Sequence, residues 1–305
     1  MTKYIVRRLQ QSVLVIFGVS LVVFFIMHMT GDPATLMLPL DATAEEVYQF
    51  KESLGLNDPL PTQYFRFLGG AVQGDFGNSL RHNSPALPLV MERLPATFQL
   101  TFLAMAIAVF IAIPIGVISA TRRYSIFDYV GTVGGLLGQS MPVFWLGIML
   151  ILLFGVQLQV LPTSGRGTFA HLILPAITLG TYSTATIMRL LRSGMVEVLK
   201  QDYIKTAQSK GLSEKVVIYK HALKNALIPV ATVIGLQFGA LLGGAVITET
   251  IFAWPGVGRL AIQAINNRDL PLVQSIVFIM ASSIVLINLL TDVAYTYLDP
   301  RIRYD

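Results

Sequence analysis

The chain has 305 residues, of which 54% are hydrophobic and only 13% are charged, and its net charge is +5. A soluble domain carries about a quarter charged residues, so this composition indicates a protein whose solvent is a lipid bilayer. Because the chain has no cysteine, disulfides and thiolate metal sites are excluded.

Six stretches of the chain contain no Asp, Glu, Lys or Arg, and each is at least 22 residues long. A helix needs about 20 residues to cross the hydrocarbon core of a bilayer, so each stretch predicts one span. We therefore expect an all-α polytopic membrane protein with six transmembrane helices. Their approximate ranges are 10–29, 97–120, 131–157, 171–191, 229–250 and 272–296.

The first span follows Lys3, Arg7 and Arg8, as the apolar core of a signal peptide would. Its apolar run is longer than a signal core, and no small-x-small cleavage site follows it. We expect an uncleaved anchor helix over residues 1–29.

A small insertion over residues 30–96 separates the first two spans, and a five-helix core over 97–305 follows it. The motifs GDP, NDPLP, GGAVQGDFG and NSPALP predict turns between short helices in this insertion. One of these helices should start after Thr43 as N-cap, with two glutamates in its first turn, and end at Gly55. We expect the insertion to pack on the membrane core.

The third span contains Pro142, which should kink or break its helix. The kink could line a passage together with Gln139, or it could only shape the helix bundle. In the fifth span, Gly235, Gly239 and Gly243 recur every four residues, and glycine pairs also occur in the third. Small residues at this spacing allow close helix packing, either within the chain or against another subunit.

The segment between the fourth and fifth spans, residues 193–228, is basic and amphipathic. Its first half places Val196, Leu199, Tyr203, Ile204 and Ala207 on one side of a helix that Gly211 should end. Ser213 should cap a second helix with a stripe of Val216, Tyr219, Leu223 and Leu227, and Pro229 should open the fifth span. Such a helix pair could dock a partner or lie on acidic headgroups.

The distribution of basic residues predicts the orientation of the chain. The N-terminus, 122–130, 189–228 and the C-terminal tail together hold fifteen Lys and Arg, against seven in the segments of the opposite side. Both termini should therefore be cytoplasmic and the insertion extracytoplasmic. The uneven distribution of Lys and Arg thus indicates the membrane topology, and it does not support nucleic-acid binding.

Catalytic motifs are missing from the sequence. There is no H-E-x-x-H, no G-x-S-x-G and no Gly-Lys pair for a Walker A loop. The four histidines are far apart in sequence, which favours packing roles over a metal site. Glu249 and Asp292 lie near the ends of spans, and intramembrane acids are candidates for contact with a transported substrate.

Motifs along almost the whole chain resemble those of the peptide/nickel family of ABC-importer permeases. The loop resembles the family's cytoplasmic loop at Ala207, Gly211 and Leu223, whereas Lys205 stands at an acidic position, and the pattern's isoleucine and proline are replaced by His221 and Lys224. The other motifs that carry the resemblance are GDP, LGLNDPL, GDFGNSL, LPAT, MPVFWLG, DYIKTAQSKGL, HALKNALIP, ETIFAWPGVGR and LDPRIRYD.

This resemblance implies a non-catalytic permease subunit in the plasma (inner) membrane of a bacterium. Its partners would be a second, related permease, two cytoplasmic ATPases that bind Mg-ATP, and an extracytoplasmic solute-binding protein. No cofactor is expected in this chain. The expected ATPase-coupling residues are Asp202, Tyr203, Lys205, Thr206, Ala207, Lys210, Gly211, His221, Leu223 and Asn225.

The expected function is import of di- or oligopeptides by alternating access. Nickel or a metal chelate is the alternative cargo within the family. An ion-coupled secondary transporter is an alternative of a different class, which would show inverted repeats and paired intramembrane acids. The candidates for the substrate path are Gln139, Pro142 and Glu249.

Overall fold

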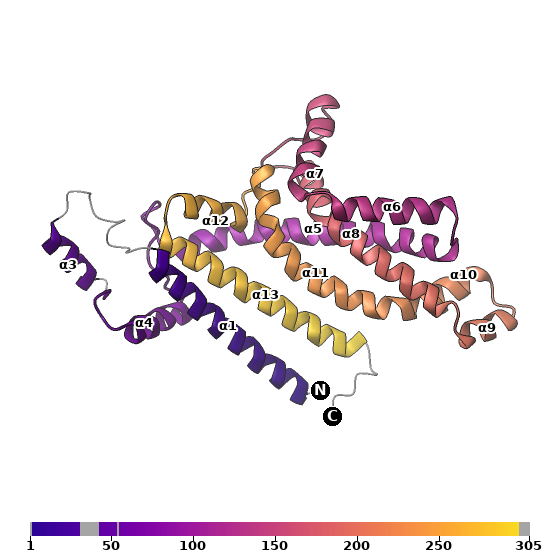
Figure 1. Cartoon of the computed structure of the whole chain (residues 1–305), viewed down its shortest axis with the longest axis horizontal. Coiled ribbons are helices and arrows are strands. Elements are labelled where there is room, and N and C mark those ends of the chain that lie inside the picture. Colours follow the sequence, from indigo (N-terminus) through magenta and orange to yellow (C-terminus); the bar gives the residue numbers. More distant parts are fainter. Residues whose placement is uncertain (1, 31–42, 54, 299–305) are drawn as a thin grey trace. The chain divides into compact units, whose positions relative to one another are not determined.

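The computed structural model describes residues 2–30, 43–53 and 55–298, which form helices joined by turns (Figure 1). Within this described part, the only β-type pairing is an isolated bridge between Asn78 and Pro85. The all-α prediction is therefore confirmed. The chain divides into two compact units: unit 1 comprises Thr97–Trp254 and the chain from Ile287 onward, and unit 2 comprises Thr2–Ala96 and Pro255–Leu286.

Unit 2 contains the first helix, the insertion and a short helix near the C-terminal end of the chain. Its helices are α1 (Thr2–Thr30), α3 (Ala44–Ser53), α4 (Leu60–Gln73) and α12 (Val257–Asn266), with the beginnings of α5 (Ala86–Thr121) and α13 (Leu270–Leu298).

Helix α3 has the predicted ends. The Thr43 hydroxyl accepts a hydrogen bond from the Glu46 amide at 3.3 Å, and the Glu46 carboxylate accepts one from the Thr43 amide at 2.8 Å. This reciprocal pair is a capping box. The chain after the helix turns through Gly55, whose φ is +66°.

Two predicted turns of the insertion lie elsewhere, and a third, GDP, lies outside the described residues. Helix α4 continues through the first two glycines of GGAVQGDFG and ends only at Gly74, with φ +80°. Helix α5 already begins at Ala86, so the prolines of NSPALP and LPAT lie inside or next to it rather than before a span. Helix α5 thus begins eleven residues before residue 97, the expected start of the second span.

Unit 2 has its own apolar core. Tyr64 of α4 packs edge-on against Phe17 and Phe24 of α1, and its hydroxyl lies 2.7 Å from that of Ser20. A second cluster joins α12, the start of α13 and the start of α5, and its fully buried members include Ala86, Val90, Val257, Ala264 and Leu272.

The buried carboxylate of Asp269 ties a surface turn to this core. It accepts hydrogen bonds from the Ser79 hydroxyl at 2.5 Å and from the amides of Leu80 and Arg81 at 3.2 Å. The Leu272 amide, in the first turn of α13, donates at 3.3 Å. One side chain thus satisfies donors from two segments that are distant in sequence.

Unit 1 contains the remaining helices. They are α6 (Ile126–Ser140), α7 (Val143–Leu150), the π-helical segment η1 (Ile151–Gln157), α8 (Ala170–Val198), α9 (Asp202–Ser209), α10 (Glu214–Val216), the π-helical segment η2 (Val217–Ala222) and α11 (Leu223–Ile251), together with most of α5 and the end of α13. Helix α8 is central, because it packs against α6 on one side and α11 on the other.

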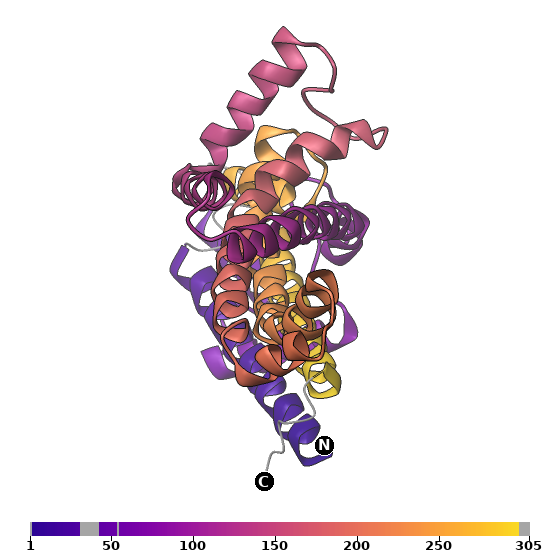
Figure 2. The ribbon, with the colours of Figure 1, turned by 90° about the vertical axis from the view of Figure 1, so that its right-hand side faces the viewer.

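The third predicted span is broken at Pro142. The chain leaves α6 at Met141, Pro142 occupies the N-cap of α7, and the two helices form an angle of 106°. Figures 1 and 2 show α7 and η1 turned away from the axis of α6. The predicted break is confirmed, and it is sharper than a proline kink within one continuous helix.

Four helices of the described chain are long and apolar enough to cross a membrane, or five if α6 and α7 form one bent span. Helix α8 is not in this count although it has 29 residues, because its polar side chains, among them His171 and four threonines, lower its hydropathy. Each of these hydroxyls donates to the carbonyl four residues earlier, from Thr178, Thr181, Thr184 and Thr186. A scale based on residue type counts such hydroxyls as polar although their donors are satisfied inside the helix.

Candidate functional site

The loop between α8 and α11 starts with a break that the sequence pattern did not predict. Helix α8 ends at Val198, the chain turns through residues 199–201, and α9 begins with Gln201 as N-cap and Asp202 in the first turn. Val196 and Leu199 therefore do not lie on the helix of Tyr203. The single helix predicted through these positions is wrong, because the amides of residues 199–201 bond to carbonyls of α8 and end it there.

Gly211 has the role that the sequence predicts. Helix α9 ends at Ser209 with Lys210 as C-cap, and Gly211 follows with φ +78°. This left-handed conformation favours glycine. A Cβ at Gly211 would meet no atom within 4 Å, so only the backbone conformation constrains this position.

Ala207 faces the interior of the chain rather than a partner. Ile204 and Ala207 are both buried, and α9 packs with this face on η2. The chain's own residues thus cover the small side chain of Ala207, and its expected part in ATPase coupling stays a prediction.

The second half of the loop continues directly into α11. Ser213 is the N-cap of α10 as expected, but its side chain makes no capping hydrogen bond. α10 then passes through η2 into α11, so Pro229 lies inside a helix and does not open one.

The predicted stripe of this second helix is also displaced. Val217, Ala222 and Ala226 are buried, whereas Val216 and Tyr219 are exposed. A π-helical segment bonds residue i to i+5 and so rotates the following side chains relative to an α-helix. A pattern counted at 3.6 residues per turn therefore fails across η2.

Several of the predicted loop residues contact one another. The Asn225 side-chain amide donates to the Tyr203 hydroxyl at 2.8 Å and to the His221 carbonyl at 2.9 Å. This links α9 to the start of α11. Lys205 forms an exposed ion pair with Asp202 at 2.9 Å, and the Thr206 hydroxyl donates to the Asp202 carbonyl.

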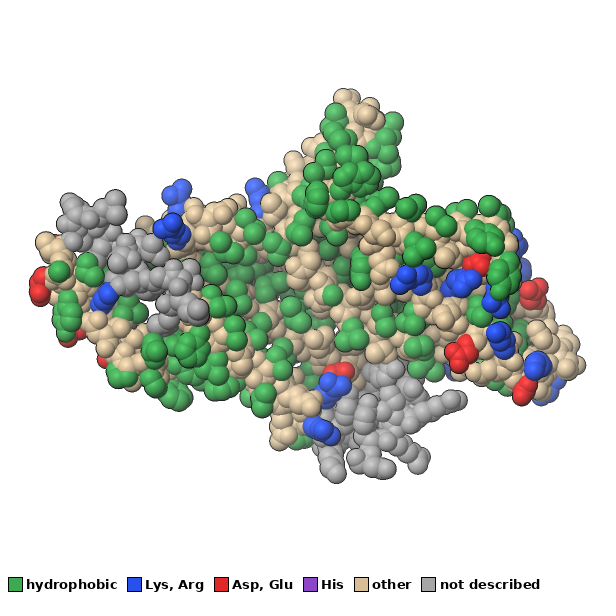
Figure 3. Space-filling view, in the orientation of Figure 1, with side chains coloured by type: hydrophobic (Ala, Val, Ile, Leu, Met, Phe, Trp, Pro, Cys, Tyr) green, Lys and Arg blue, Asp and Glu red, His purple; other side chains and the backbone are tan. Residues whose placement is uncertain are grey.

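The exposed surface of the loop combines apolar and basic side chains. Its exposed large apolar residues are Tyr203, Leu212, Val216 and Tyr219. Lysines surround them, and Lys and Arg side chains gather at this end of unit 1 (Figure 3). An apolar patch with a charged rim is the typical composition of a protein-docking surface.

An ion pair at the base of the loop is a feature that sequence reasoning missed. The Arg192 guanidinium near the end of α8 donates two hydrogen bonds to the Asp128 carboxylate of α6, of 2.6 and 2.8 Å. Asp128 is buried and also accepts from the Tyr124 amide at 3.0 Å. The signal in the sequence was that Asp128 is a single acidic residue, which follows Arg122 and Arg123 and precedes a long stretch without charged residues.

Glu249 lies at the opposite end of α11 and is fully buried. Its carboxylate accepts a hydrogen bond from the Thr97 hydroxyl at 2.6 Å. Glu249 therefore lies near the end of a span, as the sequence indicates, but it has no exposed surface in this structure. The Arg166 guanidinium lies over the Trp254 ring, 5.5 Å from the ring centroid, and donates a hydrogen bond to the Gln99 side-chain oxygen at 2.9 Å.

The other candidates for the substrate path lie on other helices than Glu249. Gln139 is half-buried in the last turn of α6, and Pro142 is exposed at the N-cap of α7. Asp292 is half-buried in α13. Among the described residues, no group of three His, Cys, Asp or Glu side chains could hold a metal ion.

The glycines of α11 have different surroundings. A Cβ at Gly235 would overlap the side chain of Thr291 in α13, so this glycine allows close packing within the chain. Gly239 is buried, whereas Gly243 is exposed and a Cβ there would meet nothing within 4 Å. Internal packing thus accounts for Gly235, and Gly243 remains open to another subunit.

The sequence matches two family models that together cover most of the chain. Residues 112–304 match the binding-protein-dependent transport system inner membrane component, and residues 1–101 match the N-terminal part of such a membrane component.

Curated relatives match over the full length. The dipeptide transport system permease protein DppB of Alkalihalophilus pseudofirmus is 44% identical, and the alignment covers 100% of both chains. The glutathione transport system permease protein GsiC of Pectobacterium atrosepticum is 41% identical, again over 100% of both. Among solved structures, an inward-facing MetNI methionine ABC transporter has a TM-score of 0.58 at 18% identity, covering 69% of this chain and 96% of that one. This last likeness concerns the fold alone.

Proposed function

This chain belongs to the family of binding-protein-dependent transport system inner membrane components, and from that premise we propose that it carries di- or oligopeptides across the membrane. It is a permease subunit of an ABC importer, in which separate ATPase subunits hydrolyse ATP. The observation that carries the proposal is the similarity to peptide permeases over the entire chain.

Peptide cargo is supported by the names of the full-length relatives. One relative is named for dipeptides and another for glutathione, which is itself a small peptide. These names favour peptides over nickel or a metal chelate, which is the alternative cargo. Substrate-path residues are proposed at Glu249, Gln139 and Pro142, with Glu249 exposed to water in another state of an alternating-access cycle.

The cytoplasmic ATPases dock on the loop between α8 and α11. Exposed Tyr203, Leu212, Val216 and Tyr219 supply the apolar contact, and the left-handed turn at Gly211 fixes the angle between α9 and α10. Ala207 and Ile204 support this surface from below. Mg-ATP binds to the ATPases, and no cofactor binds to this chain.

A topology of six spans with both termini in the cytoplasm is supported by the distribution of Lys and Arg along the sequence. Helix α8 supplies the sixth span, since its threonine hydroxyls bond within the helix. In this topology the insertion faces the solute-binding protein outside, and exposed Gly243 lies in a contact with a second, related permease.

Transport by the assembled complex tests the cargo. Proteoliposomes would contain this chain, the second permease and the ATPases, with the binding protein and labelled dipeptide outside and ATP inside. We expect dipeptide uptake that requires ATP and is not reduced by excess nickel. Uptake of nickel instead of peptide would establish the alternative cargo, and uptake driven by an ion gradient without ATP would contradict the importer mechanism.

A further inference from the structure

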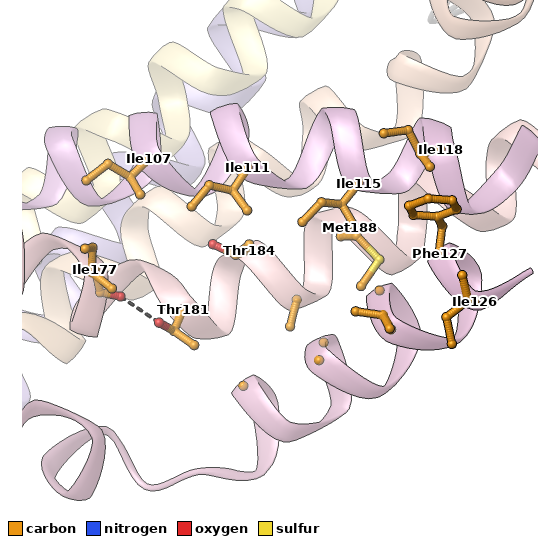
Figure 4. A pocket seen from close by; sticks show the side chains of 16 residues that line it. Ile107, Ile111, Ile115, Ile118, Ile126, Phe127, Ile177, Thr181, Thr184 and Met188 are labelled. Atoms are coloured by element: carbon orange, nitrogen blue, oxygen red, sulfur yellow. Dashed lines mark hydrogen bonds between the residues drawn. The ribbon is translucent and has the colours of Figure 1, made fainter. Parts of the chain in front are cut away.

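An apolar groove of about 610 Å³ opens in unit 1 between α5, α6 and α8. Four isoleucines of α5, at positions 107, 111, 115 and 118, follow one another along its length. Figure 4 shows these side chains lying over the groove, with Met188 of α8 behind them and Phe127 of α6 at one end.

The walls of the groove are almost free of available polar groups. The hydroxyls of Thr181 and Thr184 point to it from α8, but each donates to a carbonyl of its own helix at 2.7 and 2.9 Å. The α6 wall consists largely of glycine backbone, and a Cβ at Gly134 would meet no atom within 4 Å. A charged peptide would find no partners here, whereas a hydrocarbon chain fits this lining.

The length of the groove matches one leaflet of a bilayer. Ile107 and Ile118 are eleven residues apart on α5, which corresponds to about 16 Å along the helix axis. Half of the hydrocarbon core of a bilayer is about 15 Å thick. One acyl chain can therefore extend along the whole groove.

One end of the groove is basic. The Arg122 guanidinium lies 5.3 Å from the ring centroid of Phe127, a lining residue, and Arg123 follows in the same turn. Neither arginine forms an ion pair within the part of the chain that the structure describes. The nearby Asp128 carboxylate does not neutralise them, because it is already paired with Arg192 through two hydrogen bonds.

We propose that this groove is a binding site for an anionic phospholipid, with one acyl chain along the isoleucines of α5 and the phosphate at Arg122 and Arg123. Basic pockets between transmembrane helices on the cytoplasmic side suit anionic headgroups. The Asp128–Arg192 pair places this end beside the base of the α8–α11 loop. In the proposed topology the lipid therefore belongs to the cytoplasmic leaflet.

A helix of the second permease is the alternative occupant of this groove. A helix with its side chains is about 10–12 Å wide, so it would lie against the groove along its open side. The arginines at one end favour a lipid, because they offer partners to a phosphate and none to an apolar helix face.

Lipid retention by the assembled transporter tests the proposal. The complex would be purified from nanodiscs of phosphatidylethanolamine and phosphatidylglycerol, and retained lipids would be counted by native mass spectrometry. Gly134→Leu adds an apolar side chain to the groove wall at a position where its Cβ meets no atom within 4 Å, and Arg122→Gln removes one headgroup contact. The matched controls are Gly18→Leu, another open glycine in an apolar helix, and Lys200→Gln on the exposed loop.

We expect about one tightly held phosphatidylglycerol per wild-type chain and in both controls. Gly134→Leu should abolish this retention, and Arg122→Gln should weaken it about fivefold, the contribution of one arginine near an anionic surface. Equal retention in wild type and both groove variants would overturn the proposal, as would retention of phosphatidylethanolamine in equal amount.

A cross-linking experiment separates lipid from protein as the occupant. The chain has no cysteine, so Val130→Cys in the groove gives a single attachment point for a photoreactive maleimide. Cross-linked phospholipid supports the proposal. A cross-link to the second permease as the main product would contradict it. Both measurements are independent of peptide uptake, so a failure of the cargo test would leave them interpretable.

Discussion

Replacing Gly211 by valine tests whether the turn between α9 and α10 couples this chain to the ATPases. Gly211 has φ +78°, and a Cβ there would meet no atom within 4 Å. The substitution therefore creates no clash, and its effect comes from the left-handed backbone alone. For an L-residue this conformation costs about 1–2 kcal/mol, and a β-branched residue is among the least tolerant.

This free energy can be converted into an effect on docking. A cost of 1–2 kcal/mol reduces the population of the native turn about 5–30-fold relative to alternatives. Because only the native turn presents the surface of Tyr203, Leu212, Val216 and Tyr219, the affinity for the ATPases should fall by up to the same factor. The spans should be unaffected, since a Cβ at Gly211 meets no atom of the chain within 4 Å.

The assay compares three variants for ATPase co-purification and for peptide uptake, at equal amounts in the membrane. Gly211→Val should lose most of both, whereas Gly211→Asn should lose little because asparagine tolerates the left-handed region. Lys200→Gln, on the exposed side of the turn before α9, is the second control. Normal co-purification and uptake for Gly211→Val would show that the loop is a passive surface segment and that the coupling assignment is wrong.

Three further predictions concern topology, the buried acid and the support of the loop. A reporter inserted near Asn83 should be accessible from outside and one fused after Asp305 should not; accessibility of both from outside would refute the topology. Glu249→Gln should reduce peptide uptake with the chain still inserted, and unchanged uptake would leave Glu249 a structural role at most. Ala207→Glu should both lower the protease resistance of the loop and abolish uptake, because it places a carboxylate where α9 packs on η2. Unchanged protease resistance together with normal uptake would contradict this packing.

Features determined by local chemistry were predictable from the sequence. Thr43 and Gly55 bound a helix through short-range capping, Gly211 ends another through its left-handed φ, and Pro142 interrupts a third. Each of these signals depends on a few neighbouring residues. They require no knowledge of which segments pack together.

Features determined by distant contacts or by irregular helices were not predictable in the same way. Asp128 and Arg192 are 64 residues apart, and nothing in either segment identifies the partner. The two π-helical segments shift the register of the side chains, so the stripe counted through Tyr219 failed across η2. The burial of Ala207 also depends on that segment, because it is the surface on which α9 packs.

The paired hydrogen bonds between Arg192 and Asp128 have a consequence for how movement spreads through unit 1. Two parallel bonds to one carboxylate resist rotation as well as separation, whereas a single bond would act as a pivot. When a partner docked on the α8–α11 loop displaces the adjoining end of α8, the start of α6 should follow it. The displacement then reaches the 106° corner at Pro142, where two helical segments can change their angle without breaking any hydrogen bond within either one.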